Sequence, residues 1–254
     1  MRFLAPQPVS IGKILDASFK LYRASFSKLL VFMLISASFQ VIFGLLQMWL
    51  YKDQAQSPNL PLIIYNEHPV LMICVLLISS IITFTLHVAI IYRINNLEHQ
   101  QQDSIADALS FGFRKTPRLF LGYFLYILAV MIGTLLLIIP GIILMLSLSF
   151  FLYFVVLDSL KAYASLRASH RLIWGNWWRT LGVYTAPGVI MIVLIFSLGG
   201  IIGLVTGGNI FVTQGISNFV MAFITPYFFT LGYVQFHDLK LRKSGSDLEA
   251  RLNN

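Results

Sequence analysis

LLLIIPGIILMLSLSFFLYFVVLDSLKAYASLRASHRLIWGNWWRTLG, residues 135–182, holds the pattern that decides the fold. Two apolar runs meet at Pro140-Gly141, which leaves no room for a polar loop between them. The second run ends at Asp158, and a basic amphipathic segment, 159–174, leads to Trp177-Trp178-Arg179 at the start of another apolar run. This order predicts a helical hairpin across a membrane, followed by a helix along the membrane surface.

The composition indicates a membrane protein. Of the 254 residues 57% are hydrophobic and only 11% are charged, and the mean hydropathy is +0.79. A soluble domain carries about 25% charged residues, so too few charges remain here to cover a surface in water. The net charge of +8 indicates membrane orientation and lipid headgroups rather than nucleic acid, because the cations stand between apolar runs. The single cysteine, Cys74, excludes a disulfide framework or a Cys-based metal site within one chain.

Six apolar runs are long enough, or nearly so, to cross a bilayer as helices. We expect one integral membrane domain of all-α class over residues 1–254, with no cleavable signal peptide because the first run begins only at Leu29 and no small-residue cleavage site follows it. The predicted spans are about 29–50, 70–92, 119–139, 142–157, 181–198 and 215–236, followed by a polar tail, 237–254.

The distribution of cations predicts the orientation. Of the 18 Lys and Arg, 17 lie before the first span, between the second and third, between the fourth and fifth, or after the sixth. Only Lys52 lies in a connection on the opposite side. Since Lys and Arg concentrate in cytoplasmic loops, both termini are expected in the cytoplasm.

A basic amphipathic segment precedes each pair of spans: 10–28, 104–118 and 159–174. In the first, Leu15, Phe19, Tyr22 and Phe26 share a helical face, which fits either a helix lying in the membrane interface or a cytosolic extension of the span. In the second, Ser104 and Asp107 resemble a capping box, and a short apolar helical face ends at Pro117. The segments predict three hairpins, each introduced by an interfacial helix, and a weak repeat that permits a pseudo-threefold arrangement.

Candidate functional residues gather at the 174–179 corner. Tryptophan rings suit the headgroup boundary, and flanking arginines can bind phosphate. Ordinary anchoring without lipid selectivity is the alternative. The hypothesis is an anionic phospholipid headgroup site made by Arg171, Trp174, Trp177, Trp178 and Arg179.

Other polar residues have simpler explanations. The acids and histidine at 98, 99, 103 and 107 match no metal-ligand spacing and fit an exposed loop. His87 is expected to be an interfacial, hydrogen-bonded histidine, and His170 is expected to be packed or bonded to a lipid headgroup. Gly199, Gly203 and Gly207 recur every four residues, which suits either close helix contact or a loose outer turn. No catalytic, metal-binding or cofactor-binding residue is predicted.

Four segments carry a family resemblance: IGKILDASFKLYRASFSKLL, LIIPGIILMLSLSFFLYFVVLD, ASLRASHRLIWGNWWRTLG and FHDLKLRKSGSDLE. They resemble the YciC-like family of bacterial inner-membrane proteins, which is similar to the membrane domain fused to some glycerophosphoryl diester phosphodiesterases. The resemblance implies a bacterial cytoplasmic membrane and a connection to envelope or lipid biology. It implies no phosphodiesterase activity, because the soluble catalytic domain has no counterpart here.

Three classes of function remain open. A non-enzymatic protein acting through lipids or protein partners in envelope maintenance fits the basic helices and the tryptophans. A transporter or channel for a small solute or lipid would need a polar site; no Asp, Glu, Lys or Arg lies at mid-span, but Pro187 and Pro226 could break helices around one. An intramembrane enzyme would have to bring together Ser79, His87 and Asp158, which are isolated in sequence.

Overall fold

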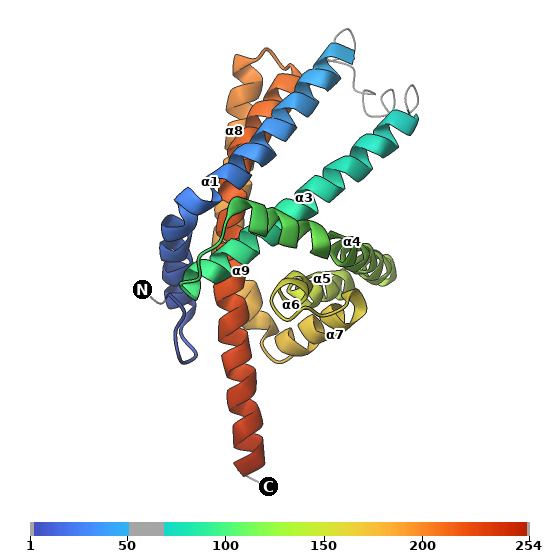
Figure 1. Cartoon of the computed structure of the whole chain (residues 1–254). Helices are drawn as coiled ribbons and strands as arrows, with labels where there is room; N and C mark the ends of the chain where they lie inside the picture. The colour runs from blue at the N-terminus through green and yellow to red at the C-terminus, as the bar shows by residue number, and fades with distance from the viewer. Residues whose placement is uncertain (1–2, 51–68, 253–254) are drawn as a thin grey trace.

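The computed structural model describes residues 3–50 and 69–252, and these ranges are mostly helical and contain no strand (Figure 1). The connection between the first two predicted spans, residues 51–69, lies almost wholly outside them. The helices, in chain order, are α1 (Ile11–Leu50), α3 (Pro69–Glu98), α4 (Ile105–Leu136), α5 (Ile138–Leu148), α6 (Phe151–Val156), α7 (Ala162–Ile173), α8 (Trp177–Val205) and α9 (Ile210–Leu252).

Six helical segments of the described chain are long and apolar enough to cross a membrane, which confirms the predicted class. The fourth is formed by α5 and α6 together, Ile138–Val156, and the sixth is Val212–Gly245 within α9. The last helix thus continues well past residue 236, where the sequence predicted the start of a polar tail.

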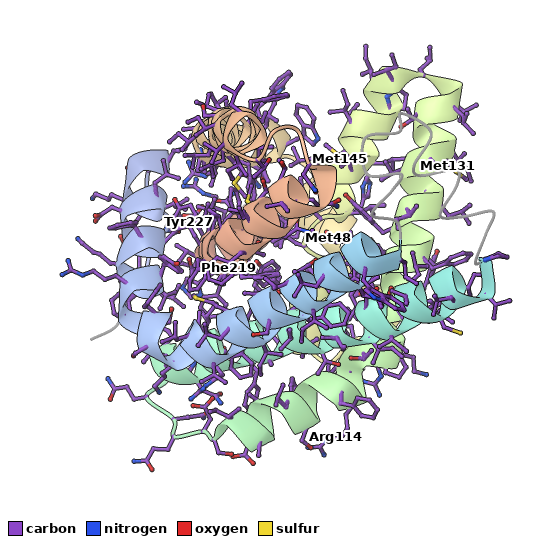
Figure 2. The ribbon with its side chains drawn as sticks, turned by 90° about the horizontal axis from the view of Figure 1, so that it is seen from above. Met48, Arg114, Met131, Met145, Phe219 and Tyr227 are labelled. Atoms are coloured by element: carbon purple, nitrogen blue, oxygen red, sulfur yellow. The ribbon has the colours of Figure 1, made fainter. Side chains whose placement is uncertain are left out.

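Helices α1 and α9 pack along each other and form the centre of the fold, with α3 beside them and α4 beside α3. The predicted surface helix 10–28 and the span 29–50 form one continuous helix, and both views show α1 changing direction along its length (Figures 1 and 2). Its buried side chains include Ile14, Ser18, Leu21 and Ser25. Ser18 Oγ donates to the Ile14 carbonyl and Ser25 Oγ to the Tyr22 carbonyl, a pattern that bends helices.

The hairpin between α4 and α5 turns at Leu137, not at Pro140-Gly141 as predicted. Leu137 is extended, with φ −162° and ψ 146°, and Pro140 lies in the first turn of α5, where a missing N–H leaves no bond unmade. Gly141 instead allows the two helices to approach: a Cβ there would lie 2.9 Å from Thr134 Cα. The glycine is therefore required by helix packing rather than by the turn.

The predicted continuous span 142–157 is broken at Ser149 and Phe150, between α5 and α6. Ser169 of α7 spans the break: its hydroxyl donates to the Ser147 carbonyl at 2.9 Å and accepts from the Phe150 N–H at 3.0 Å. Buried backbone groups need such partners. Helix α7 is consequently held against the fourth apolar segment.

Three prolines lie inside helices rather than ending them: Pro117 in α4, Pro187 in α8 and Pro226 in α9. The predicted end of a short helix at Pro117 is therefore wrong, and α4 runs through it. The capping box at Ser104 and Asp107 is confirmed. Gly199 and Gly203 lie in α8 and would meet no atom within 4 Å if given a Cβ, so they make no close helix contact in the described chain.

Candidate functional site

Polar segments that lie far apart in sequence meet at one end of the helices, which we call the polar end. It comprises residues 3–9, 93–107, 157–179 and 237–244. The Glu98 carboxylate accepts hydrogen bonds from the Phe3 and Leu4 N–H groups at 3.0–3.1 Å. Lys240 Nζ donates to the Asp158 carboxylate at 2.7–2.8 Å. The first contact joins the N-terminal segment to the end of α3, and the second joins the segment before α7 to the last part of α9.

Asp238 is the centre of an ionic cluster at the polar end. Its carboxylate accepts from Arg179 Nε at 3.2 Å, from Arg242 Nε at 2.8 Å and from the Val9 N–H at 2.9 Å. Both guanidinium groups also donate to the Val9 carbonyl. The Asp238 side chain is only 4% exposed. Hydrogen bonds between a guanidinium group and a carboxylate are strong because both groups are charged. Arg179 therefore joins α8, α9 and the N-terminal segment.

The acids that the sequence placed in an exposed loop also have internal partners. Asp103 accepts from Arg93 Nε at 3.0 Å, and Lys28 Nζ lies 3.9 Å from it. Arg93 Nη1 donates to the Lys28 carbonyl at 2.8 Å, and Glu98 is buried against the N-terminal segment. Each of these carboxylates therefore stabilises the polar end, and the loop is less exposed than predicted.

A cavity of about 730 Å³ lies beneath the N-terminal segment, between the ends of α3 and α9. Its polar side chains are bonded within the protein: Tyr233 Oη donates to Asn95 Oδ1 at 2.9 Å, and His237 Nε2 lies 3.1 Å from the Ala5 carbonyl oxygen. Glu98, Asp158 and Lys240 in its wall have the partners already described. The cavity therefore offers few groups that still need a ligand.

The corner between α7 and α8 presents part of the predicted headgroup site. Gly175 adopts φ +92°, a left-handed conformation that glycine reaches without strain, and this turns the chain from α7 into α8. Trp174 and Trp178 are 62% and 79% exposed, and Arg171 is also exposed. Trp177 is half-buried and meets Trp178 edge to face, with ring centroids 4.8 Å apart.

The structure thus divides the five predicted residues. Arg171, Trp174 and Trp178 face outward, Trp177 packs beside Trp178, and Arg179 is engaged by Asp238 and Val9. The packing of α7 likewise leaves some residues of this segment exposed and buries others. Leu166 and Ile173 are apolar residues of the segment predicted to lie along the membrane surface, and both are buried in the protein.

A basic groove of about 670 Å³ runs between α7 and the last part of α9. Its cations are Arg167 and Arg171 from α7 and Lys240 and Lys243 from α9. Arg167 and Arg171 are exposed. Phe154, Leu160 and Leu172 add apolar wall to this groove, and Tyr163 and Ser244 add hydroxyls.

Sequence reasoning missed Arg167, Lys240 and Lys243 as members of one site. The only signal was the spacing of Arg167 and Arg171, four residues apart on a helix. Nothing in the sequence brings α9 beside α7. In the structure α7 and α9 contact each other, and Lys240 of α9 lies over the Phe154 ring of α6 and the Phe236 ring of its own helix, with centroid distances of 5.5 and 4.5 Å.

Comparison with known proteins gives one family match. No curated protein and no solved structure matches the chain. Residues 119–237 match the model of a domain of unknown function, DUF7847. The matched region is slightly less than half the chain. It contains Arg167, Arg171 and the tryptophan corner but ends before Lys240, and the similarity to the YciC-like family stays a prediction. The chain is therefore similar to DUF7847 from the third predicted span to the end of the sixth.

Proposed function

We propose that this chain is a multi-pass protein of a bacterial cytoplasmic membrane, with both termini and the polar end in the cytoplasm. The six apolar helices support the first part. The proposed orientation rests on the cation distribution, because the segments carrying 17 of 18 Lys and Arg include those that form the polar end. The exposed tryptophans at the same end suit the headgroup boundary.

Within this membrane arrangement we propose three helical hairpins, each introduced by a surface helix. The first part of α1 supports this best. Phe19 and Phe26 are exposed apolar side chains, and Lys13, Lys20 and Arg23 are exposed on the same stretch. Such a helix can bury its rings below the headgroups and keep its cations in water. Helix α7 has only Tyr163 and Trp174 to offer the bilayer, because the protein covers the rest of its apolar face.

We infer that the protein acts without catalysis, by binding anionic phospholipid at its cytoplasmic face. The observation that carries this is the basic groove, in which four cations from two helices flank an opening with apolar walls. Each Lys or Arg near an anionic surface contributes about 1 kcal/mol. Trp174 and Trp178 can hold indole rings at headgroup depth nearby. The groove replaces Arg179 with Arg167 as a proposed phosphate-binding group beside Arg171, while Lys240, which pairs with Asp158, and Lys243 add positive charge to the groove.

The positions of the potential catalytic residues support a non-enzymatic role. Ser79 Oγ donates to the Leu76 carbonyl of its own helix, and Asp158 pairs with Lys240. His87 lies against the Phe229 ring, with centroids 4.8 Å apart. None of these contacts joins a nucleophile to a base.

The test compares lipids that co-purify with two charge-matched variants. Arg167→Gln with Arg171→Gln removes two groove cations, whereas Lys13→Gln with Arg23→Gln removes two exposed cations from α1. By mass spectrometry, the first pair should lower the share of anionic phospholipid about ten-fold or more, as the loss of roughly 2 kcal/mol implies. The second pair should change it less. Equal losses in both would mean that general surface charge, not the groove, attracts the lipid.

A further inference from the structure

A second polar site lies among the apolar helices, between α1, α3 and α9. It is a cavity of about 140 Å³. The hydrogen-bonding side chains in its wall come from all three helices: Ser36, Gln40, Thr83, His87, Asn218 and Thr225. Since polar groups inside a membrane are rare and mark functional paths, six of them around one space need an explanation.

The polar groups of this cavity are incompletely paired. His87 Nδ1 is buried and has no hydrogen-bond partner among the described residues. Gln40 and Asn218 meet at 3.4 Å, a long hydrogen bond. Pro226, also in the wall, has no N–H to give the Ala222 carbonyl. In apolar surroundings these groups favour a ligand that can donate and accept hydrogen bonds.

The cavity wall contains no Asp, Glu, Lys or Arg, so it offers no compensation for an ionic ligand. A charged group would lose its hydration there without a counter-ion. Hydroxyl groups fit the mixed donors and acceptors of amide, imidazole and hydroxyl side chains. The chemistry therefore points to a neutral ligand that bears hydroxyls.

An apolar groove of about 250 Å³ lies between α1 and α9, two of the three helices that surround the polar cavity. Gly44 and Gly215 widen it, and Met48 and Phe219 line it; Figure 2 shows Met48 and Phe219 near each other. Gln40 precedes Gly44 by one turn in α1, and Asn218 follows Gly215 by one turn in α9. The polar cavity and the apolar groove therefore follow each other along one helix pair.

We propose that these two spaces together bind one molecule of a neutral lipid, its hydroxyl-bearing head in the polar cavity and its hydrocarbon chain in the groove. This site is separate from the basic groove and binds no phosphate. The lipid-site proposal rests on the proposed membrane location in one respect: α1 and α9 must face lipid. A free polyol bears the same hydroxyl groups as the lipid head but has no hydrocarbon chain. Binding in the apolar groove therefore distinguishes the lipid from the free polyol.

The test uses full-length protein in phosphatidylcholine vesicles and a monooleoylglycerol probe with a photoactivatable group in its acyl chain. The label should map to 41–48 of α1 and 212–219 of α9, and unlabelled monooleoylglycerol should compete with it. Thr83→Val, which keeps the side-chain shape, should lower labelling about five-fold, the effect of one neutral hydrogen bond. Thr185→Val, an exposed threonine on α8, is the matched control and should leave labelling unchanged.

Two competitors on the unmodified protein keep the test independent of folding. Free glycerol at equal concentration and 1-octadecene should both fail to displace the probe, because one lacks the chain and the other the hydroxyls. Displacement by 1-octadecene would overturn the polar head site, and displacement by glycerol would overturn the lipid. Label spread evenly over exposed apolar helices would overturn both. Anionic lipid retained by the basic groove is measured separately, so either proposal can fail alone.

Discussion

Arg179 Nε donates a hydrogen bond to Asp238 Oδ2 over 3.2 Å, although 59 residues separate them in sequence. The bond joins the first turn of α8 to the part of α9 that continues beyond residue 236, where the predicted span ends. Val9 and Arg242 complete the cluster. The end of α9 is therefore anchored to the rest of the fold, and its basic residues reach α7 in a fixed position.

Replacing Asp238 by asparagine should destabilise the protein by about 2 kcal/mol, because two guanidinium groups lose a buried carboxylate. The expected measurement is a lower midpoint of thermal unfolding in detergent. Asp16→Asn is the matched control: Asp16 pairs with Lys20 on the exposed surface of α1 at 2.7 Å, and its loss should change stability by no more than about 0.5 kcal/mol. Similar shifts in both variants would contradict a structural role for the Asp238 cluster.

Local features of the fold could be predicted from sequence, and contacts between distant segments could not. The Ser104 capping box depends on residues three apart, where helical spacing alone places side chains together. Arg179 was misjudged because its partner Asp238 lies on another helix. The break at Ser149 was missed because Ser169 of α7, which bonds the freed backbone, lies 20 residues further along the chain. The polar cavity was missed for the same reason.

The α4–α5 hairpin should be sensitive to one added methyl group. Gly141→Ala places a Cβ against Thr134, whose backbone cannot move without shifting α4. We expect a loss of about 1–3 kcal/mol in stability, the usual effect of overpacking. Gly188→Ala is the control, since nothing lies within 4 Å of a Cβ there, and alanine at a helical position should leave stability unchanged or raise it slightly. Thermal unfolding in detergent measures both; equal stability of the two variants would exclude close packing at Gly141.

The capping box gives the N-terminus of α4 a pH dependence. Asp107 Oδ2 accepts from Ser104 Oγ at 2.7 Å and from the Ser104 N–H at 3.1 Å, and these bonds hold the pKa of the Asp107 carboxyl below its ordinary value. Because the pKa is lowered in the folded state, the stabilisation is present above the ordinary pKa of aspartate and is lost as the pH falls through the lowered value.

Ser104→Ala should therefore raise the pKa of Asp107 toward its ordinary value. An NMR titration of the Asp107 side-chain carboxyl carbon in detergent micelles measures this directly. Ser27→Ala removes an exposed hydroxyl from α1 and should leave the titration unchanged. An Asp107 titration that is identical with and without the Ser104 hydroxyl would show that the bond does not persist in solution.

The contacts at the polar end also sharpen the topology prediction. Val9 precedes the first predicted span, and Glu98, Asp158 and Asp238 follow the second, fourth and sixth. The segments that contain these residues are nevertheless bonded to one another: Glu98 and Asp238 to the N-terminal segment, and Asp158 to Lys240 near Asp238. Segments bonded to each other must lie on the same side of a membrane, so any orientation that places the N-terminus in the cytoplasm places the others there. Only an even number of spans between successive segments meets this condition.

Reporter fusions should consequently alternate out, in, out, in, out, in when placed after Lys52, Ala106, Pro140, Lys161, Gly207 and Asn254. Alkaline phosphatase is active outside the cytoplasm and green fluorescent protein inside, so the pair gives opposite readouts at each site. Arg179→Gln serves as a control at the last position. It removes a contact at the polar end but keeps the excess of cations, and since that excess sets the orientation, the pattern should not change. A signal outside the cytoplasm at Asn254 in the unmodified chain would exclude six spans with a cytoplasmic N-terminus, because the Asp238 cluster could not join α9 to an N-terminal segment on the other side of the membrane.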